Sequence, residues 1–260
     1  MMDIEIIRKR DQAEGNFNNG EILEKKPIGF PQDGGMSRPY SNLFYWAHAW
    51  TNEDKSTIGL HPHQGFEICS FVLEGEINHY DTKQERWIPL KKGEVQIIRS
   101  GSGISHSEEL LERSEIFQIW FDPDLSKSLS KEASYDDYKP EDFNIEKKEE
   151  YHKKTIVGPG SKMRMDSEGI EIFEYRLFEN KNVDIVQDKE FIYSYFLIEG
   201  CLRIDDKTID VEMRILGDWK DHLRPPQTSL KVKTIESSFH GITRFNLFLP
   251  ETRKGENEVF

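Results

Sequence analysis

The chain has 260 residues and a formal net charge of -13, and this acidic balance argues against nucleic acid as a direct ligand because it repels phosphates. A hydrophobic content of 36% can build the core of one large domain or of two smaller ones. Two distant cysteines, Cys69 and Cys201, exclude a disulfide framework and a thiolate zinc cluster, and no apolar run reaches signal-peptide or membrane-spanning length. We therefore expect a cytoplasmic protein without a membrane or nucleic-acid partner.

The first half of the chain predicts β-strands. Short runs rich in Ile, Val, Phe and Tyr are separated by Gly, Asn, Asp and Pro, as is typical of strands joined by turns. The runs cover residues 4–7, 41–50, 65–73, 87–90, 95–98 and 116–121. Many short strands at spacings near ten residues indicate an all-β sandwich or barrel.

Two short motifs within these strands carry four potential metal ligands. His61-Pro-His63 and His106-Ser-Glu108 each place two donors two residues apart, so both donors point to one face of an extended strand. A single strand histidine is usually an ordinary polar side chain, but two such pairs, flanked by glycines, predict a metal site. The other histidines are assigned structural roles: His48, His79, His152, His222 and His240.

The donor set predicts one divalent transition metal. Three imidazoles and a carboxylate suit Fe(II), which we place first, or Ni(II), Mn(II), Cu(II) or Zn(II), and they offer too few oxygens for calcium. Four protein ligands leave two octahedral positions for water, dioxygen or substrate, whereas tetrahedral zinc would be closed. Spacing alone leaves the carboxylate open, because Glu67 shares the strand parity of His61 and His63 and competes with Glu108, while Glu109 points away.

A polar stretch then separates two halves that repeat one another. Residues 126–154 are rich in Ser, Lys and Glu and predict a solvated connector with at most one short helix. Phe71-Val-Leu-Glu-Gly75 recurs as Phe196-Leu-Ile-Glu-Gly200, and Phe117-Gln-Ile-Trp-Phe121 recurs as Phe245-Asn-Leu-Phe-Leu249. Two matches in the same order and at nearly one offset favour a duplication.

The second half is expected to keep the scaffold and to lack the metal site. An offset of 125 residues carries His61 and His63 to Val186 and Asp188. Beyond Gly217 the chain offers Trp219, His222 and His240, with no His-x-His or His-x-Glu pair. We expect an N-terminal metal-binding domain over residues 1–125, a connector over 126–154 and a degenerate copy over 155–260.

Several segments of the first half carry a family resemblance. They are His61-Pro-His-Gln-Gly-Phe-Glu67, Leu73-Glu-Gly-Glu76 with His79 and Asp81, the glycine-rich run from Gly93 to Glu108, and Phe117-Gln-Ile-Trp120. Together they resemble the pirin family of the cupin superfamily. Ala133-Ser-Tyr-Asp-Asp-Tyr138 in the connector is similar to the family's short segment between domains, whereas the second half matches weakly, mainly around 196–200.

The resemblance implies a bicupin, which is an all-β protein of two antiparallel barrels packed face to face with one metal in the N-terminal barrel. The pirin ligands correspond to His61, His63, His106 and Glu108. A plain cupin would instead use Glu67 as a ligand and would place its last histidine where Ile104 stands. Glu67 then becomes a group that hydrogen-bonds a ligating imidazole or a bound water.

The same resemblance implies a function. We expect a dioxygenase of the quercetin 2,3-dioxygenase type, which would act on a flavonol or a related aromatic or enediol molecule in the N-terminal barrel, with Glu108 or Glu67 as the catalytic base. Phe71 and Leu73 fit an apolar pocket wall and plain core equally well, and Cys69 fits a small buried hydrophobe. The alternative is a non-enzymatic regulator that binds a protein partner and whose metal stabilises the fold or senses redox state. An isomerase is a third, less favoured, hypothesis.

Overall fold

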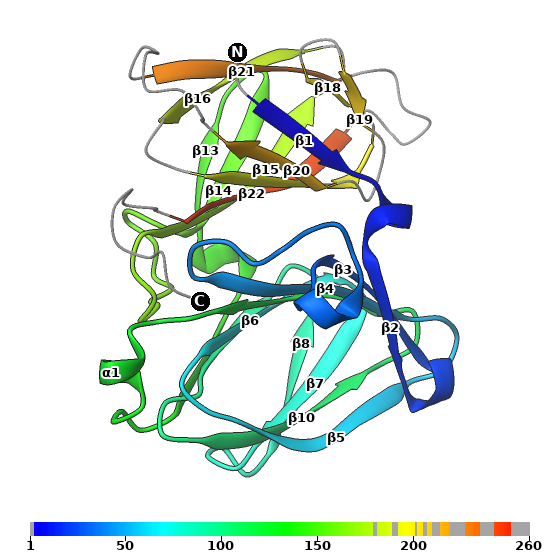
Figure 1. The fold of residues 1–260 in the computed structure, drawn as a ribbon, viewed down its shortest axis with the longest axis vertical. Helices are drawn as coiled ribbons and strands as arrows, with labels where there is room; N and C mark the ends of the chain where they lie inside the picture. Colours follow the sequence, from blue (N-terminus) through cyan, green and yellow to red (C-terminus); the bar gives the residue numbers. More distant parts are fainter. Residues whose placement is uncertain are drawn as a thin grey trace. The chain divides into compact units, whose positions relative to one another are not determined.

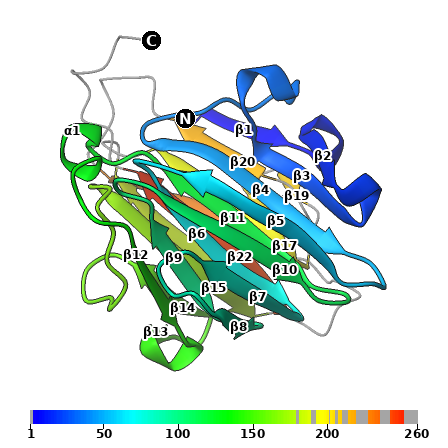
Figure 2. The same cartoon turned by 90° about the horizontal axis from the view of Figure 1, so that it is seen from below.

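The computed structural model of the protein describes residues 3–178, 181–188, 192–200, 202–204, 207–209, 214–218, 227–234 and 242–250. These residues are almost entirely β-strands, which confirms the all-β prediction (Figures 1 and 2). Among them no helix is both long and apolar enough to cross a membrane. The chain divides into two compact units, each of which is a two-sheet barrel and is described by itself.

The first barrel comprises Arg10–Asp142 together with Arg164–Glu168. Its larger sheet has the strand order β12-β9-β6-β11-β4-β3-β2, and its smaller sheet has the order β5-β10-β7-β8. The strands are β2 (Ala13–Phe17), β3 (Ile22–Ile28), β4 (Leu43–Thr51), β5 (Ser56–His63), β6 (Glu67–Glu74), β7 (Glu76–Asp81), β8 (Trp87–Lys91), β9 (Val95–Arg99), β10 (Ile104–Leu110), β11 (Glu115–Phe121) and β12 (Ser134–Tyr138). Short helical turns join them: Asn18–Gly20, Pro31–Asp33, α1 (Leu125–Ser128) and Pro140–Asp142, with Lys9–Asp11 at the boundary of the unit.

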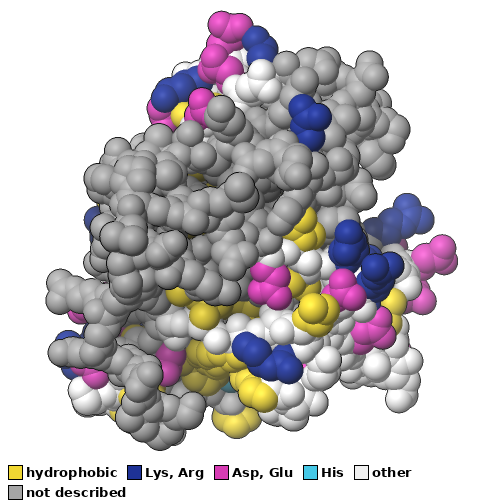
Figure 3. Space-filling view, turned by 45° about the horizontal axis from the view of Figure 1, so that its top comes forward, with side chains coloured by type: hydrophobic (Ala, Val, Ile, Leu, Met, Phe, Trp, Pro, Cys, Tyr) yellow, Lys and Arg dark blue, Asp and Glu magenta, His cyan; other side chains and the backbone are white. Residues whose placement is uncertain are grey.

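Side chains from both sheets meet inside this barrel. Strand parity directs every second residue inward, and a buried cluster joins the two sheets: Ile22, Ala49, Val72, Ile77, Leu90, Leu110 and Ile116. Outside, acidic and basic side chains are interspersed on the described part of the face drawn in Figure 3. The negative net charge is therefore not gathered into a single patch on that part of the face.

The second barrel comprises Met1–Lys9, Phe143–Met163 and Gly169–Phe260. Its sheets have the strand orders β1-β20-β17-β22-β15-β14-β13 and β16-β21-β18-β19. The strands are β1 (Asp3–Ile7), β13 (Asn144–Lys147), β14 (Tyr151–Val157), β15 (Ile170–Phe178), β16 (Asn182–Asp188), β17 (Tyr193–Glu199), β18 (Leu202–Ile204), β19 (Lys207–Ile209), β20 (Arg214–Asp218), β21 (Gln227–Thr234) and β22 (Ile242–Pro250).

The strand orders of the two barrels match one to one, which supports the duplication. The repeated Phe-Val-Leu-Glu-Gly segment forms β6 in one barrel and β17 in the other, and each of these strands pairs with the strand that carries the second repeat, β11 or β22. Gly75 and Gly200, which end the first repeat, have positive φ angles of 70° and 92°. Glycine adopts this left-handed backbone without steric cost, which explains why both copies keep it.

The connector differs from the solvated segment expected over residues 126–154. Ser134–Tyr138 pairs with β9 of the first barrel, whereas Asn144–Lys147 and Tyr151–Val157 extend a sheet of the second. The N-terminal strand Asp3–Ile7 pairs with β20 and so belongs to the second barrel. Edge strands such as these pair through their backbones and need little apolar side-chain surface, so a polar composition does not reveal them.

Candidate metal centre

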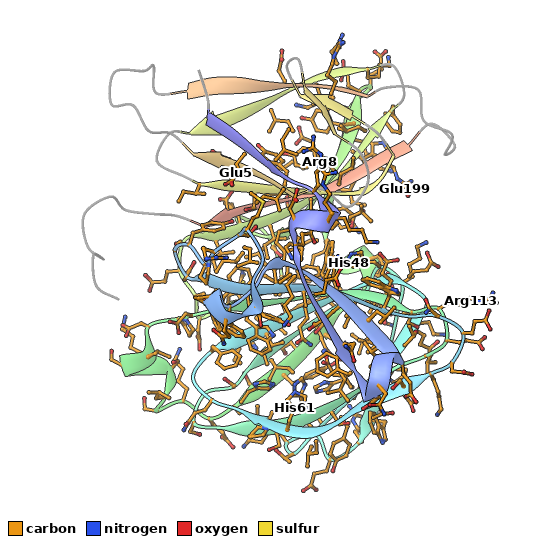
Figure 4. The ribbon with its side chains drawn as sticks, turned by 45° about the vertical axis from the view of Figure 1, so that its right-hand side comes forward. Glu5, Arg8, His48, His61, Arg113 and Glu199 are labelled. Carbon is orange, nitrogen blue, oxygen red and sulfur yellow. The ribbon has the colours of Figure 1, made fainter. Side chains whose placement is uncertain are left out.

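The first barrel brings the two histidine motifs side by side. His61 and His63 lie at the end of β5, and His106 lies on β10, which pairs with β5 in antiparallel register. His61 is directly opposite His106, and the side chain of His61 is labelled within this barrel in Figure 4. A bulge between His106 and Glu108 shifts the register immediately after the pair. Bulges of this kind re-aim side chains next to functional sites.

The three imidazoles converge on one point. Each histidine offers a nitrogen, and these nitrogens lie within 4.8 Å of one another. Nε2 of His63 is 3.0 Å from Nε2 of His106. Nδ1 of His61 lies 2.8 Å from the carbonyl oxygen of Gly59. When that Nδ1 donates its proton to the carbonyl, Nε2 keeps a free lone pair for a metal.

Burial keeps two of these imidazoles neutral. Desolvation, followed by the charge of neighbouring histidines, lowers the pKa of His63 to about 3. The same causes lower the pKa of His106 to about 3. A neutral imidazole is the form that binds metals, so the donors are ready at neutral pH. Converging, neutral nitrogen donors fit a divalent transition metal, and His61, His63 and His106 would hold it.

Glu108 lies beside this cluster in a hydrogen-bonded setting of its own. One carboxylate oxygen of Glu108 lies within 4.8 Å of donor nitrogens of His79 and His106. The cluster that His61 and His63 form with His106 at the same distance does not include Glu108. Oε2 accepts a hydrogen bond of 2.6 Å from the amide of Gln118, whose own oxygen accepts one from Trp120. Oε1 faces Ser70 and Gln96 at 3.4 and 3.3 Å. The predicted role of Glu108 as the fourth ligand stays a prediction.

His79 is a site residue that the sequence reasoning missed. It is fully buried beside His106, with ring centroids 5.7 Å apart, and it stacks on Tyr135 at 4.5 Å. Its Nε2 lies 2.7 Å from Oδ2 of buried Asp81, whose other oxygen accepts from the backbone amides of Lys83 and Gln84. Nδ1 of His79 and Nδ1 of His106 are both buried without a hydrogen-bond partner in the described part of the chain. The signal was the His-x-Asp spacing, which places both side chains on one strand face.

Glu67 is held by partners other than those expected from the sequence. Both oxygens of this buried carboxylate accept hydrogen bonds from a neighbouring loop: Oε1 from the backbone amide of Asp166 at 2.7 Å, and Oε2 from the amide and hydroxyl of Ser167. Burial raises the pKa of Glu67, and these hydrogen bonds oppose the shift. Glu67 therefore holds residues 164–168 to the first barrel, and its expected role beside a ligating imidazole stays a prediction. Ser70 and Val72 on the same strand reach Glu108 and the core between the sheets, so Glu67, which has the opposite parity, lies on the other face of the sheet.

The remaining histidines follow their structural assignments as far as the structure describes them. His48 is buried and pairs with Glu115 at 2.5 Å, and His152 packs edge-on against Phe178 in the second barrel. His222 and His240 lie outside the described residues, as do Trp219 and Cys201. Cys69 is fully buried with a raised thiol pKa caused by desolvation, which agrees with a small hydrophobic role.

Two of the three imidazoles, those of His61 and His63, line a cavity of about 340 Å³ in the first barrel, whereas His106 is fully buried. Its walls come from six strands and are mostly apolar: Phe17, Glu24, Tyr45, Ala47, Ala49, Ile58, Gly59, His61, His63, Glu108, Leu110, Ile116, Gln118 and Trp120. Phe71 and Leu73 are not part of this wall, and Phe71 is instead buried. This volume lies within the usual range for small-molecule sites.

The sequence of this barrel matches one family model. Residues 36–121, which include both histidine motifs and most of the cavity wall, match the Pirin family. Over this range the first barrel is similar to the Pirin family, and it is called the pirin domain below. A pirin-like protein from Caulobacter vibrioides is 42% identical over 125 residues, which cover 45% of this chain and 51% of that protein. A quercetin 2,3-dioxygenase from Escherichia coli K12 is 41% identical over 71 residues, which cover 26% of this chain and 30% of the enzyme.

The chain thus spans about half the length, or less, of the curated relatives that it matches by sequence. The likeness in fold extends further. The crystal structure of the bacterial pirin YhhW from Escherichia coli, in complex with nickel(II), superposes with a TM-score of 0.74 and covers 96% of this chain and 99% of that one. Sequence identity to it is 19%, so this likeness concerns the fold, which is a bicupin.

Among the described residues, the cluster of three histidines lies in the pirin domain. The strands of the second barrel that correspond to β5 and β10 are β16 and β21. Their sequences, Asn-Val-Asp-Ile-Val-Gln-Asp and Gln-Thr-Ser-Leu-Lys-Val-Lys-Thr, contain no histidine, cysteine or glutamate. These two strands therefore do not carry the His-x-His and His-x-Glu pairs of β5 and β10, and the expected absence of a metal site from the second half stays a prediction.

Proposed function

We propose that this chain is a metal-dependent dioxygenase that acts on a flavonol or a related aromatic or enediol molecule. One observation carries the proposal: three imidazoles converge, those of His63 and His106 are held neutral, and those of His61 and His63 line a cavity of about 340 Å³ with mostly apolar walls. The local similarity to a protein named quercetin 2,3-dioxygenase supports this class of substrate. The expected cofactor is one divalent transition metal, with Fe(II) first and nickel, manganese, copper or zinc as alternatives.

The metal would supply a Lewis acid that lowers the pKa of a substrate hydroxyl and a centre at which dioxygen can react. His61, His63 and His106 would hold it. Glu108 lines the cavity and, of the two carboxylates considered as a base, is the one beside the imidazoles, so it would accept the hydroxyl proton. Gln118, itself held by Trp120, fixes the Glu108 carboxylate for that transfer. Apolar side chains such as Ile116 exclude water from the bound ring.

The test is turnover after metal reconstitution. The protein is freed of metal, loaded separately with Fe(II), Ni(II), Mn(II) or Cu(II), and supplied with quercetin in air. We expect loss of the quercetin absorbance together with oxygen uptake for at least one metal, and neither signal for the metal-free protein. A Glu108→Gln variant should retain bound substrate but turn over about 100-fold more slowly, the usual scale of general-base catalysis. No turnover of quercetin or of simple catechols with any metal would contradict catalysis and favour the regulatory alternative.

A further inference from the structure

The cavity of the pirin domain has a second polar end. Glu24 on β3 and Tyr45 on β4 both line it, and each is only 6% exposed. The Tyr45 hydroxyl donates to Oε2 of Glu24 at 3.2 Å, and Nζ of Lys26 lies 3.3 Å from Oε1. A carboxylate is costly to bury, and burial raises the pKa of Glu24 against the influence of Lys26. Packing alone does not explain why a carboxylate lies in this mostly apolar wall.

The fold makes room for this carboxylate. Gly15 on β2 pairs with Glu24, and a Cβ atom at Gly15 would lie 2.0 Å from Oε1 of Glu24. The glycine therefore leaves the space that the side chain occupies. Lys26 is in turn held by Asp33, at 3.3 Å, so the group that neutralises Glu24 is itself fixed. Glu24 is thus a positioned carboxylate with one neighbour on each oxygen.

Glu24 lies across the cavity floor from the metal centre. Strand β4 separates β3 from β11, which carries the Gln118 amide bound to Glu108. Two strand spacings amount to about 10 Å. Small side chains, Ala47 and Ala49, line the floor between them and leave the path open. A flat molecule of two or three fused or linked rings would span that distance.

The chemistry of the two ends differs. The imidazole end would hold a metal and hence an oxygen donor, whereas at the other end the ionised Glu24 carboxylate accepts hydrogen bonds. Each carboxylate oxygen has two acceptor positions, and the contacts to Tyr45 and Lys26 use one on each. Hydrogen bonds to a charged acceptor are roughly twice as strong as neutral ones, so a ligand hydroxyl would gain from this partner.

We propose that Glu24, held by Tyr45 and Lys26, is a second binding subsite that accepts a hydrogen bond from a hydroxyl group on the far ring of a flat aromatic substrate whose near end reaches the imidazoles. The subsite rests on the proposed function and narrows it to polyhydroxylated aromatics. Glu24 is a specificity-determining residue in this scheme and takes no part in the reaction itself.

The test compares two ligands that share the metal-binding end. Quercetin carries hydroxyl groups on its outer rings, whereas 3-hydroxyflavone has the same 3-hydroxyl and 4-carbonyl but none there. Both are titrated under argon against the nickel(II)-loaded protein, and binding is followed by quenching of tryptophan fluorescence, since Trp120 lines the cavity. We expect Glu24→Gln to weaken quercetin about tenfold, the scale of one hydrogen bond to a charged group, and to leave 3-hydroxyflavone within about twofold.

Two further variants test whether the loss comes from the position of the carboxylate and not from the loss of its charge. Glu24→Asp keeps the charge for Lys26 but withdraws the carboxylate by one methylene, so it should show the same selective loss in a folded protein. Glu14→Gln is the matched control, because Glu14 lies on the neighbouring strand, is exposed and pairs with Lys25. It should change neither affinity.

The outcomes separate the subsite from the function. Equal loss of both ligands, or no loss of either, in a protein whose wild type binds both would overturn the subsite alone. Wild-type protein that binds neither flavonol would overturn the subsite and the proposed substrate class together.

Discussion

The two barrels of this chain share one topology and differ in what their equivalent strands carry. Strands β5 and β10 of the first barrel place His61, His63 and His106 around one point, whereas β16 and β21 of the second hold none of these donors. Both barrels nevertheless form the same pair of sheets in the same order. The scaffold is therefore specified by strand pattern and turns, and the metal centre is an addition to one copy.

Buried polar residues surround the candidate metal centre in the first barrel. In the pirin domain, polar residues are buried inside the barrel and paired with one another: Ser70, Gln96, His79, Asp81 and Glu108. Buried polar groups cost free energy unless they are hydrogen-bonded, so such a network is retained where it orients a site. The predictions below test whether the site and the scaffold can be separated as this contrast implies.

The largest effect is expected from removing one imidazole. His63→Ala should abolish stoichiometric metal binding and leave both barrels folded, because the second barrel has the same fold without these donors. Elemental analysis gives the metal content, and circular dichroism gives the fold. His152→Ala in the second barrel is the matched control and should keep full occupancy. Full occupancy in His63→Ala would refute the assignment, and global unfolding would show that scaffold and site are not separable.

A smaller loss of metal affinity is expected when His79, which lies beside His106, loses its charged partner Asp81. Asp81→Asn removes the charge that faces Nε2 of His79, so His79 no longer has a fixed proton position beside His106. Changes of this kind commonly lower metal affinity about 10- to 100-fold. Competition with a chelator of known affinity measures the shift, with Asp54→Asn in an exposed loop as the control. Unchanged affinity would return His79 to a purely structural role.

Acid should lower the stability of the metal-free pirin domain more than that of the second barrel. The pKa values of His63 and His106 are lowered to about 3, below the value of about 6.5 for an unfolded histidine. Between these values the unfolded chain binds more protons, so the stabilising contribution is complete above pH 6.5 and is lost as the pH falls towards 3. Hydrogen exchange resolved by barrel, at pH 7 and pH 5, measures this.

The variant His63→Asn should reduce that pH dependence, because one of the two lowered histidines is gone. Bound metal should raise the protection of the pirin domain at both pH values, because it binds the folded donor set and not the unfolded chain. Equal loss of protection in both barrels between pH 7 and pH 5 would contradict the assignment of this acid sensitivity to the imidazole cluster.

Sequence reasoning succeeded where a pattern is local. Strand parity predicted that His61, His63 and His106 come together, as they do, and turn conformation explains Gly75 and Gly200, whereas the role of Glu108 stays a prediction. It was incomplete where partners come from distant strands. His79 reaches His106 because β7 pairs with β10, and the edge strand Ser134–Tyr138 is held by backbone pairing, neither of which the spacing reveals.

Substitution of Glu67 is expected to change metal affinity least. It also tests most directly whether spacing in the sequence can identify the partners of a side chain. Its carboxylate accepts hydrogen bonds from Asp166 and Ser167 and from no imidazole in the described part of the chain, so Glu67→Gln should keep metal content and affinity within about twofold. The free energy of unfolding should instead fall by about 1 to 3 kcal/mol, the usual cost of losing hydrogen bonds to a buried charge. Glu74→Gln, at the exposed end of the same strand, should cost almost nothing. Loss of metal from Glu67→Gln at unchanged stability would restore Glu67 to the metal centre, and would show that strand parity had located its partners better than the hydrogen bonds of the fold.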